Sequence, residues 1–134
     1  MTEKEESFRE VFLDLGTQYY AAARESARVG LTPVYGNLFH HALEMYLKAA
    51  LVSLVPIDEL KNKYKHNLRR LWDRLKVDKP DLGEFDGVIA DIDPFEDIRY
   101  PDRIVESGFI CSINWEREPG FSPPHITVGE DPVG

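Results

Sequence analysis

Polar residues that can do chemistry recur at helical spacing within residues 33–54, a stretch that is otherwise apolar. They are Asn37, His40, His41, Glu44 and Lys48. At about 100° per residue, these five side chains fall on one stripe of a helix. Histidine exchanges protons near neutral pH and ligates metals, and a glutamate four residues before a lysine forms a helix ion pair. We therefore expect a central helix whose polar stripe faces solvent or a partner.

The histidines of this stripe do not complete a metal site in the sequence. Most metal sites need three or more protein ligands, and no second cluster of histidine, cysteine or carboxylate residues is placed to supply them. Cys111 is the only cysteine, so it cannot form an internal disulfide. Nucleophile elbows, phosphate loops and dinucleotide fingerprints are also missing. We expect no metal and no cofactor, and we interpret the stripe as structural or interface residues or as a site facing a nucleotide or RNA.

A basic segment follows the apolar stretch. Residues 61–79 carry eight lysines and arginines against two acids, whereas residues 80–134 carry thirteen acids against three bases. Arg69 and Arg70 lie in the basic segment, and the aromatic residues Tyr64 and Trp72 are interleaved with it. This charge pattern is typical of a phosphate-binding surface, and a solvated helix face has the same composition. The acidic remainder argues against duplex DNA binding by the whole surface.

Hydrophobic periodicity predicts helices over residues 3–28, 33–54, 66–76 and 82–92, with a short helical turn over 58–64. Short connections make neighbouring helices antiparallel, so we expect a mainly α fold, an antiparallel up-and-down four-helix bundle. The small residues Ala21, Ala22 and Ala23 should let the second helix approach the first closely.

The C-terminal part of the sequence changes character. Two β-type runs, residues 109–115 and 125–128, flank a loop rich in proline and glycine. We therefore divide the chain into a helical bundle over 3–102 and an extended or β-hairpin arm with a mobile end over 103–134. The N-terminus lacks the order of a signal peptide, and no segment has about 18 uninterrupted apolar residues, so we expect a cytoplasmic protein without membrane association.

Three segments together resemble the HEPN superfamily of small helical-bundle proteins: FHHALEMYLKAAL at 39–51, KHNLRRLWDRL at 65–75 and IRYPD at 98–102. The first matches the family pattern Ala-x-Glu-x-x-x-Lys-Ala through Ala42, Glu44, Lys48 and Ala49. The second and third match through a histidine and leucine at a helix start and through an Arg-Tyr-Pro exit: His66, Leu68, Arg99, Tyr100 and Pro101. The resemblance covers about residues 8–102.

The resemblance implies a dimeric bundle with a polar cleft near the dimer interface. Many members of the family are metal-independent RNA-cleaving toxins or defence proteins. Others bind nucleotides, RNA or a partner protein, often of the nucleotidyltransferase type. The catalytic members carry arginine and histidine separated by four to six residues, and this sequence departs from that pattern. After Arg99 those positions hold Ile104, Val105 and Glu106, and no other arginine has a histidine at that distance.

Three functions remain open from the sequence. We prefer a non-catalytic HEPN-like module, a homodimer that binds a nucleotide, RNA or a nucleotidyltransferase-type partner, as a component of a toxin–antitoxin or defence system. The first alternative is a divergent metal-independent ribonuclease, with His40, His41, His66 and Arg99 as candidate catalytic residues. The second is a purely structural dimerisation protein. The residues expected at a ligand or an interface are Asn37, His41, Glu44, Lys48, Arg69, Arg70, Arg99 and Tyr100.

Overall fold

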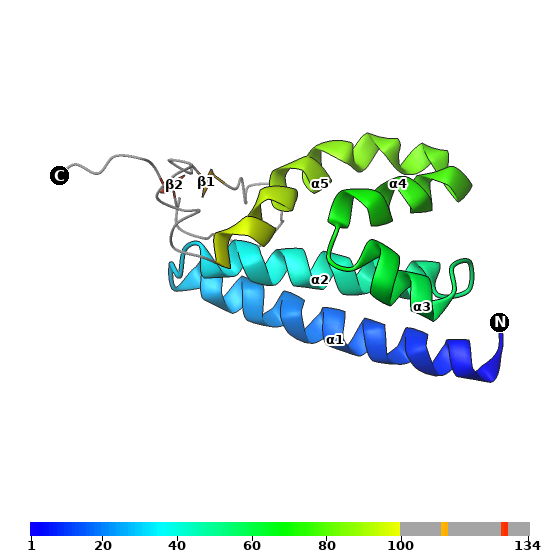
Figure 1. Cartoon of the computed structure of the whole chain (residues 1–134). Coiled ribbons are helices and arrows are strands. Elements are labelled where there is room, and N and C mark those ends of the chain that lie inside the picture. Colours follow the sequence, from blue (N-terminus) through cyan, green and yellow to red (C-terminus); the bar gives the residue numbers. More distant parts are fainter. Residues whose placement is uncertain (100–110, 113–126, 129–134) are drawn as a thin grey trace.

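The computed structural model describes residues 1–99, 111–112 and 127–128. This part of the chain is mainly helical, which confirms the predicted fold class at that level (Figure 1). Two long helices, α1 (Glu3–Arg28) and α2 (Val34–Leu51), lie antiparallel and side by side. The shorter helical elements follow and cover α2 on the side away from α1.

Helix α1 begins at a capping box. The Thr2 hydroxyl accepts a hydrogen bond from the Glu5 backbone N–H at 3.1 Å, and the Glu5 carboxylate accepts one from the Thr2 N–H at 2.9 Å. Two of the four otherwise unpaired N–H groups at this end are thereby satisfied. Gly30, whose φ is +78°, follows the helix and allows the chain to turn back toward α2.

Small residues set the spacing between α1 and α2. The buried residues of α1 are Gly16, Ala23 and Ala27. A Cβ at Gly16 would stand 2.9 Å from the Tyr46 ring, so only glycine fits that position without a shift. The sequence prediction for this contact was correct only for Ala23, because Ala21 and Ala22 are exposed.

A π-helical turn follows α2 and precedes the basic helix. The chain runs through α3 (Ile57–Glu59) into the π-helix η1 (Leu60–Tyr64), and Lys65 then adopts a φ of +48°. Helix α4 (Leu68–Asp78) begins after Asn67, whose side chain accepts a hydrogen bond from the Arg70 N–H at 3.0 Å. The predicted start at residue 66 is therefore two residues early, because the side-chain cap fixes the first turn.

The predicted helix over 82–92 is divided into two elements. A 3₁₀ helix, η2 (Pro80–Phe85), precedes α5 (Asp86–Ile92), and a further 3₁₀ helix, η3 (Asp93–Arg99), follows it. Asp86 joins α5 to α4, because its carboxylate accepts hydrogen bonds from the Trp72 indole N–H at 2.6 Å and from the Lys76 ammonium at 2.8 Å. These two hydrogen bonds lower the pKa of Asp86.

The 3₁₀ helix η3 returns to the first half of α2. A Cβ at Gly36 would overlap the Phe95 ring, so glycine permits this close approach. The Asn37 side-chain amide also donates a hydrogen bond to the Phe95 carbonyl oxygen at 3.1 Å. Phe95 is buried against these residues, and η3 is thereby held beside the beginning of α2 (Figure 1).

The main hydrophobic core lies between the second half of α2 and the elements that follow it. Its ten buried residues are Leu47, Leu51, Val55, Leu60, Tyr64, Leu68, Leu71, Trp72, Leu75 and Ile89. Helix α1 adds only the partly buried Phe12 to this cluster. The core therefore leaves α1 at its edge, where a space between α1 and η1 can remain open.

Two short strands are described in the C-terminal part. Strand β1 (Cys111–Ser112) pairs antiparallel with β2 (Thr127–Val128), with Cys111 opposite Val128 and Ser112 opposite Thr127. The rest of the predicted arm, residues 103–134, lies outside the described residues. The up-and-down order of four bundle helices remains a prediction.

Candidate functional site

The polar stripe of α2 is turned toward the rest of the chain. His40, Glu44 and Lys48 are 0%, 1% and 7% exposed, while Asn37 and His41 are partly buried. The sequence prediction of a stripe facing solvent or a partner is therefore wrong for its three buried members. Buried polar groups are costly unless they are paired. The pairing of these side chains identifies the elements that they contact.

Glu44 is the centre of a three-residue cluster, the Glu44 cluster, formed with Lys48 and His66. Its carboxylate accepts a hydrogen bond from the Lys48 ammonium at 2.9 Å. The Nδ1 atom of His66 lies 3.1 Å from each of the two carboxylate oxygens. Lys48 and Glu44 are one helical turn apart on α2, whereas His66 comes from the connection between η1 and α4. The cluster therefore joins two segments that are 22 residues apart in the sequence.

The geometry of the cluster fixes one tautomer of a neutral His66 ring. A carboxylate only accepts hydrogen bonds, so the Nδ1 atom facing Glu44 must carry the hydrogen. The Nε2 atom then has a free lone pair and can accept a hydrogen bond or a proton. The His66 side chain as a whole is 55% exposed. A buried carboxylate that orients an exposed histidine is an arrangement used by general bases.

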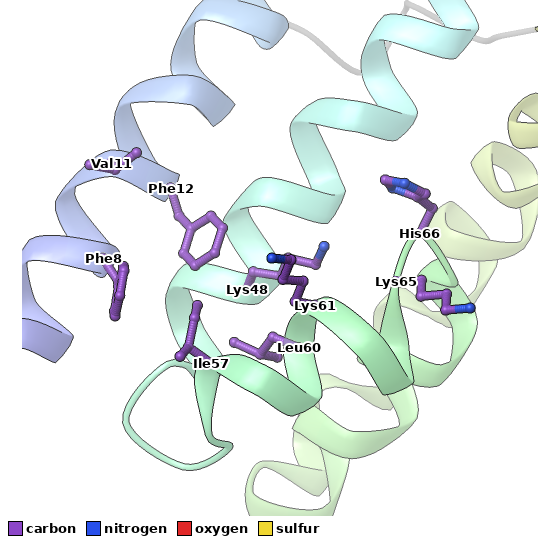
Figure 2. A pocket seen from close by; sticks show the side chains of 9 residues that line it. All are labelled: Phe8, Val11, Phe12, Lys48, Ile57, Leu60, Lys61, Lys65 and His66. Carbon is purple, nitrogen blue, oxygen red and sulfur yellow. The ribbon is translucent and has the colours of Figure 1, made fainter.

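A cavity of about 630 Å³ lies beside the cluster, between α1, the end of α2 and the α3–η1 segment (Figure 2). One side is apolar and is formed by Phe8, Val11, Phe12, Ile57 and Leu60. The other is basic and is formed by Lys48, Lys61, Lys65 and His66. None of these nine lining residues is acidic. The cavity can therefore hold a ligand with an apolar or aromatic body and an anionic group.

The predicted basic segment consists of two parts with different surroundings. Arg74 and Lys76 form ion pairs with Asp78 and Asp86. Apart from Lys79 at the end of the segment, which is also exposed and unpaired, five basic residues are exposed and form no ion pair within the described part of the chain: Lys61, Lys63, Lys65, Arg69 and Arg70. Two of these, Lys61 and Lys65, line the cavity. The remaining three extend the positive charge over the outside of η1 and the first turn of α4.

Arg70 is held in place at this surface. Its guanidinium lies 5.6 Å from the centre of the Tyr64 ring and donates a hydrogen bond to the Lys63 carbonyl oxygen at 3.2 Å. The Lys63 ammonium lies 5.5 Å from the same ring. Neither of the predicted residues Arg69 and Arg70 lines the cavity. Arg70 packs on η1, whereas the charge of Arg69 acts on Asp86 at the start of α5 and helps to lower the pKa of that carboxyl.

His40 and His41 are separate from the Glu44 cluster. The Nδ1 atom of His40 is 3.5 Å from the Glu96 carboxylate, and neither ring nitrogen of His40 has a hydrogen-bond partner in the described structure. Burial lowers the pKa of His40, although the nearby charges of Glu96 and Glu44 act in the opposite direction. His41 instead stacks on Tyr19, with ring centres 5.1 Å apart. Of the three candidate histidines, only His66 lines the cavity.

The remaining predicted site residues are placed only in part. Asn37 anchors η3 to α2, as described above, and this is a structural role. Arg99 is the last residue of η3, but its side chain and the whole of Tyr100 lie outside the described residues. The relation of Arg99 to any histidine therefore stays a prediction.

Sequence reasoning missed the apolar side of the cavity. Phe8, Val11 and Phe12 recur at the three- and four-residue spacing of an apolar helix face, but Val11 is 57% exposed. Lys61 and Lys65 were recognised as basic residues and were not assigned to a site. The feature that marks this site is visible only in the structure. It is the π-helical turn η1, which forms one wall of the cavity, and such turns are frequent at functional sites.

Neither a helix that could span a membrane nor a cluster that could hold a metal ion occurs among the described residues. No described helix combines the length and the apolar composition needed to cross a membrane. No group of three or more histidine, cysteine, aspartate or glutamate residues gathers there in a way that could hold a metal ion. No family model matches the chain, and no curated protein or solved structure matches it either.

Proposed function

We propose that this chain is a HEPN-like helical module that binds a nucleotide or RNA in the cavity between α1, α2 and η1. The observation that carries the proposal is the division of the cavity into an apolar side and a basic side with no acidic lining residue. Aromatic and aliphatic side chains accept a base by stacking and contact, and lysines accept phosphate. The exposed guanidinium of Arg70, which packs on the Tyr64 ring, extends the same charge beyond the cavity.

Other parts of the proposal come from the sequence, most of them from the resemblance. They are membership of the HEPN superfamily, an up-and-down order of four helices, a homodimer, a cytoplasmic location and a nucleotidyltransferase-type partner in a toxin–antitoxin or defence system. The Glu44–Lys48 pair that supports the resemblance adjoins the cavity, because Lys48 is one of its lining residues. Light scattering after size-exclusion chromatography tests the homodimer, and a pull-down with a co-expressed nucleotidyltransferase tests the partner.

Calorimetric titration of the whole chain with nucleotides and short single-stranded RNA tests the binding function. We expect binding that weakens as salt rises, because phosphate contacts release counterions. The double variant Lys61→Ala/Lys65→Ala should lose most of the affinity. Lys63→Ala is the matched control, since Lys63 lies between them in the sequence, is equally exposed and does not line the cavity. If neither nucleotides nor RNA bind at millimolar concentration, the proposal is wrong.

A metal-independent ribonuclease is the second candidate, and the Glu44–His66 contact favours it. The His66 Nε2 atom could take the proton of a ribose 2′-hydroxyl, whose oxygen would attack the adjacent phosphorus and form a 2′,3′-cyclic phosphate. The bond to the 5′-oxygen of the next nucleotide would break, and that oxygen would take up a proton from water. Glu44 would stabilise the imidazolium through Nδ1, and Lys61 would balance charge on the phosphorus centre. Purified protein should then cleave an RNA oligomer and His66→Asn should abolish cleavage, while His41→Asn should leave it intact. An intact oligomer after prolonged incubation with the wild type would exclude this candidate.

A further inference from the structure

The charges and the hydrogen-bonding groups around the cavity narrow the expected ligand to a smaller chemical class than nucleotides or RNA in general. The Lys48 charge is already balanced by Glu44 at 2.9 Å. Lys61 and Lys65 line the cavity and have no carboxylate partner among the described residues. The cavity therefore has one uncompensated positive charge, that of Lys61, inside it and a second, that of Lys65, at its rim. Figure 2 shows Lys61 near the middle of the cavity and the Lys65 ammonium turned away from its centre, at the rim.

Two positive charges match a terminal phosphate better than an internal one. A phosphomonoester carries about −1.5 to −2 charges near pH 7. A phosphodiester inside a nucleic-acid chain carries a single charge. The size of the cavity, about 630 Å³, suits one small-molecule ligand. The cavity is bounded by α1 on one side and by α3 and η1 on the other (Figure 2).

The apolar side favours an aromatic body over a flexible aliphatic chain. Phe8 and Phe12 are one helical turn apart on α1, so their side chains occupy the same face of the helix. Both line the cavity. Planar aromatic side chains stack on nucleobases without strong preference for one base.

His66 adds a requirement for a hydrogen-bond donor on the ligand. Because its Nδ1 hydrogen faces Glu44, the Nε2 atom of the neutral ring is an acceptor. A phosphate that carries no hydrogen has only acceptors, so it cannot satisfy this atom. A ribose hydroxyl can donate to it. His66 lines the same cavity as Lys61 and Lys65.

We infer that the cavity recognises a ribonucleoside monophosphate unit, either free or as the phosphorylated end of a single strand. Lys61 and Lys65 bind the terminal phosphate, Phe8 and Phe12 contact the base, and the Nε2 atom of His66 accepts a hydrogen bond from a ribose hydroxyl. This inference rests on the proposed binding function and narrows it to one chemical class of ligand.

Four calorimetric titrations of the whole chain test the inference, with adenosine 5′-monophosphate, adenosine, 2′,3′-dideoxyadenosine 5′-monophosphate and octanoate. Loss of the phosphate should weaken binding about 10- to 100-fold, since charged hydrogen bonds are lost. Loss of both ribose hydroxyls should weaken it about 2- to 10-fold, the effect of one neutral hydrogen bond. Octanoate, which has a single charge and no ring, should bind least.

Variants assign each preference to its residue. In Lys61→Ala/Lys65→Ala, adenosine and its monophosphate should bind equally, whereas Lys63→Ala should keep the wild-type ratio. In His66→Asn, the amide N–H can still reach Glu44 but no acceptor replaces Nε2, so the monophosphate and its dideoxy analogue should bind equally. Circular dichroism and thermal unfolding confirm that each variant is folded.

The outcomes separate this inference from the proposed function. If an RNA oligomer without a terminal phosphate binds as tightly as the phosphorylated oligomer, the inference is wrong and the proposed function stands. If adenosine binds as tightly as its monophosphate, the inference is also wrong and the proposed function stands. If octanoate binds and no nucleotide or RNA does, both are wrong and the cavity is a site for aliphatic anions.

Discussion

Removing the Glu44 carboxylate should destabilise the fold far more than removing an exposed one. Glu44 is 1% exposed and Lys48 is 7% exposed, so Glu44→Leu leaves a lysine charge with little access to water. Breaking a buried pair by removing one partner costs about 3–5 kcal/mol. Lys48 also lines the cavity, which gives its ammonium some solvent, so we expect about 3 kcal/mol. That is a large share of a total stability of about 5–15 kcal/mol.

A double-mutant cycle measures the effect of pairing. Glu44→Leu/Lys48→Met replaces both charges by apolar groups and should be about as stable as the wild type, since such replacements are often neutral or stabilising. The free energy of unfolding is obtained from urea titration followed by far-ultraviolet circular dichroism, with the slope checked for each variant. Glu25→Leu is the matched control, because the Glu25–Arg28 pair is exposed on both sides. Its stability should hardly change.

Two results would refute the reasoning about the Glu44 cluster. If Glu44→Leu lowers the free energy of unfolding by less than about 1 kcal/mol, the lysine charge is not effectively buried. If the double variant is as unstable as the single one, the loss comes from packing around position 44 and not from an unpaired charge.

Further predictions concern η3 and the buried histidine. Gly36→Ala should lower the free energy of unfolding by about 1–3 kcal/mol, because its methyl group overlaps the Phe95 ring. Gly87→Ala is the control, because Gly87 also lies in a helix and has nothing within 4 Å of the added Cβ. It should raise the free energy of unfolding by up to about 1 kcal/mol. If urea titration shows that both substitutions change the free energy of unfolding in the same direction, the packing of η3 against Gly36 is contradicted. The lowered pKa of His40 means that the unfolded chain binds its proton first, below about pH 6.5, so stability falls as the pH falls through that window. Between pH 7.5 and 5, His40→Leu should therefore show a flatter dependence of stability on pH than the wild type, and identical slopes would show that His40 titrates normally.

Much of the helical structure follows from local sequence signals. The first predicted helix coincides with α1 (Glu3–Arg28), because its apolar periodicity runs along the whole helix and, in the structure, Thr2 caps its start. The predicted helix over 82–92 is divided because glycines at 83 and 87 weaken helical propensity on both sides of Asp86. Asp86 is also held by Trp72 and Lys76, and this tertiary contact has no trace in local periodicity.

The candidate site also has a part that the sequence predicts and a part that depends on tertiary contacts. The Glu44–Lys48 pair is predictable because both residues lie on one helix, four positions apart. The third member, His66, joins through a contact across 22 residues that depends on how η1 turns back toward α2. The apolar side of the cavity was not predictable, since periodicity indicates which face of a helix is apolar but not whether another element covers it. Here α3 and η1 leave Val11 exposed.

The Glu44 cluster also limits how this sequence can change over evolutionary time. A substitution at position 44 alone passes through a protein with a buried, unpaired lysine, and a substitution at 48 alone leaves a buried carboxylate with His66 as its remaining partner. A protein with only one of these substitutions is less stable than a protein with none of them or with both charges replaced. The three positions should therefore be inherited or replaced together. Divergent descendants of this chain should therefore either keep all three residues or have lost the charged pair as a unit, with position 66 free to vary only in the second group.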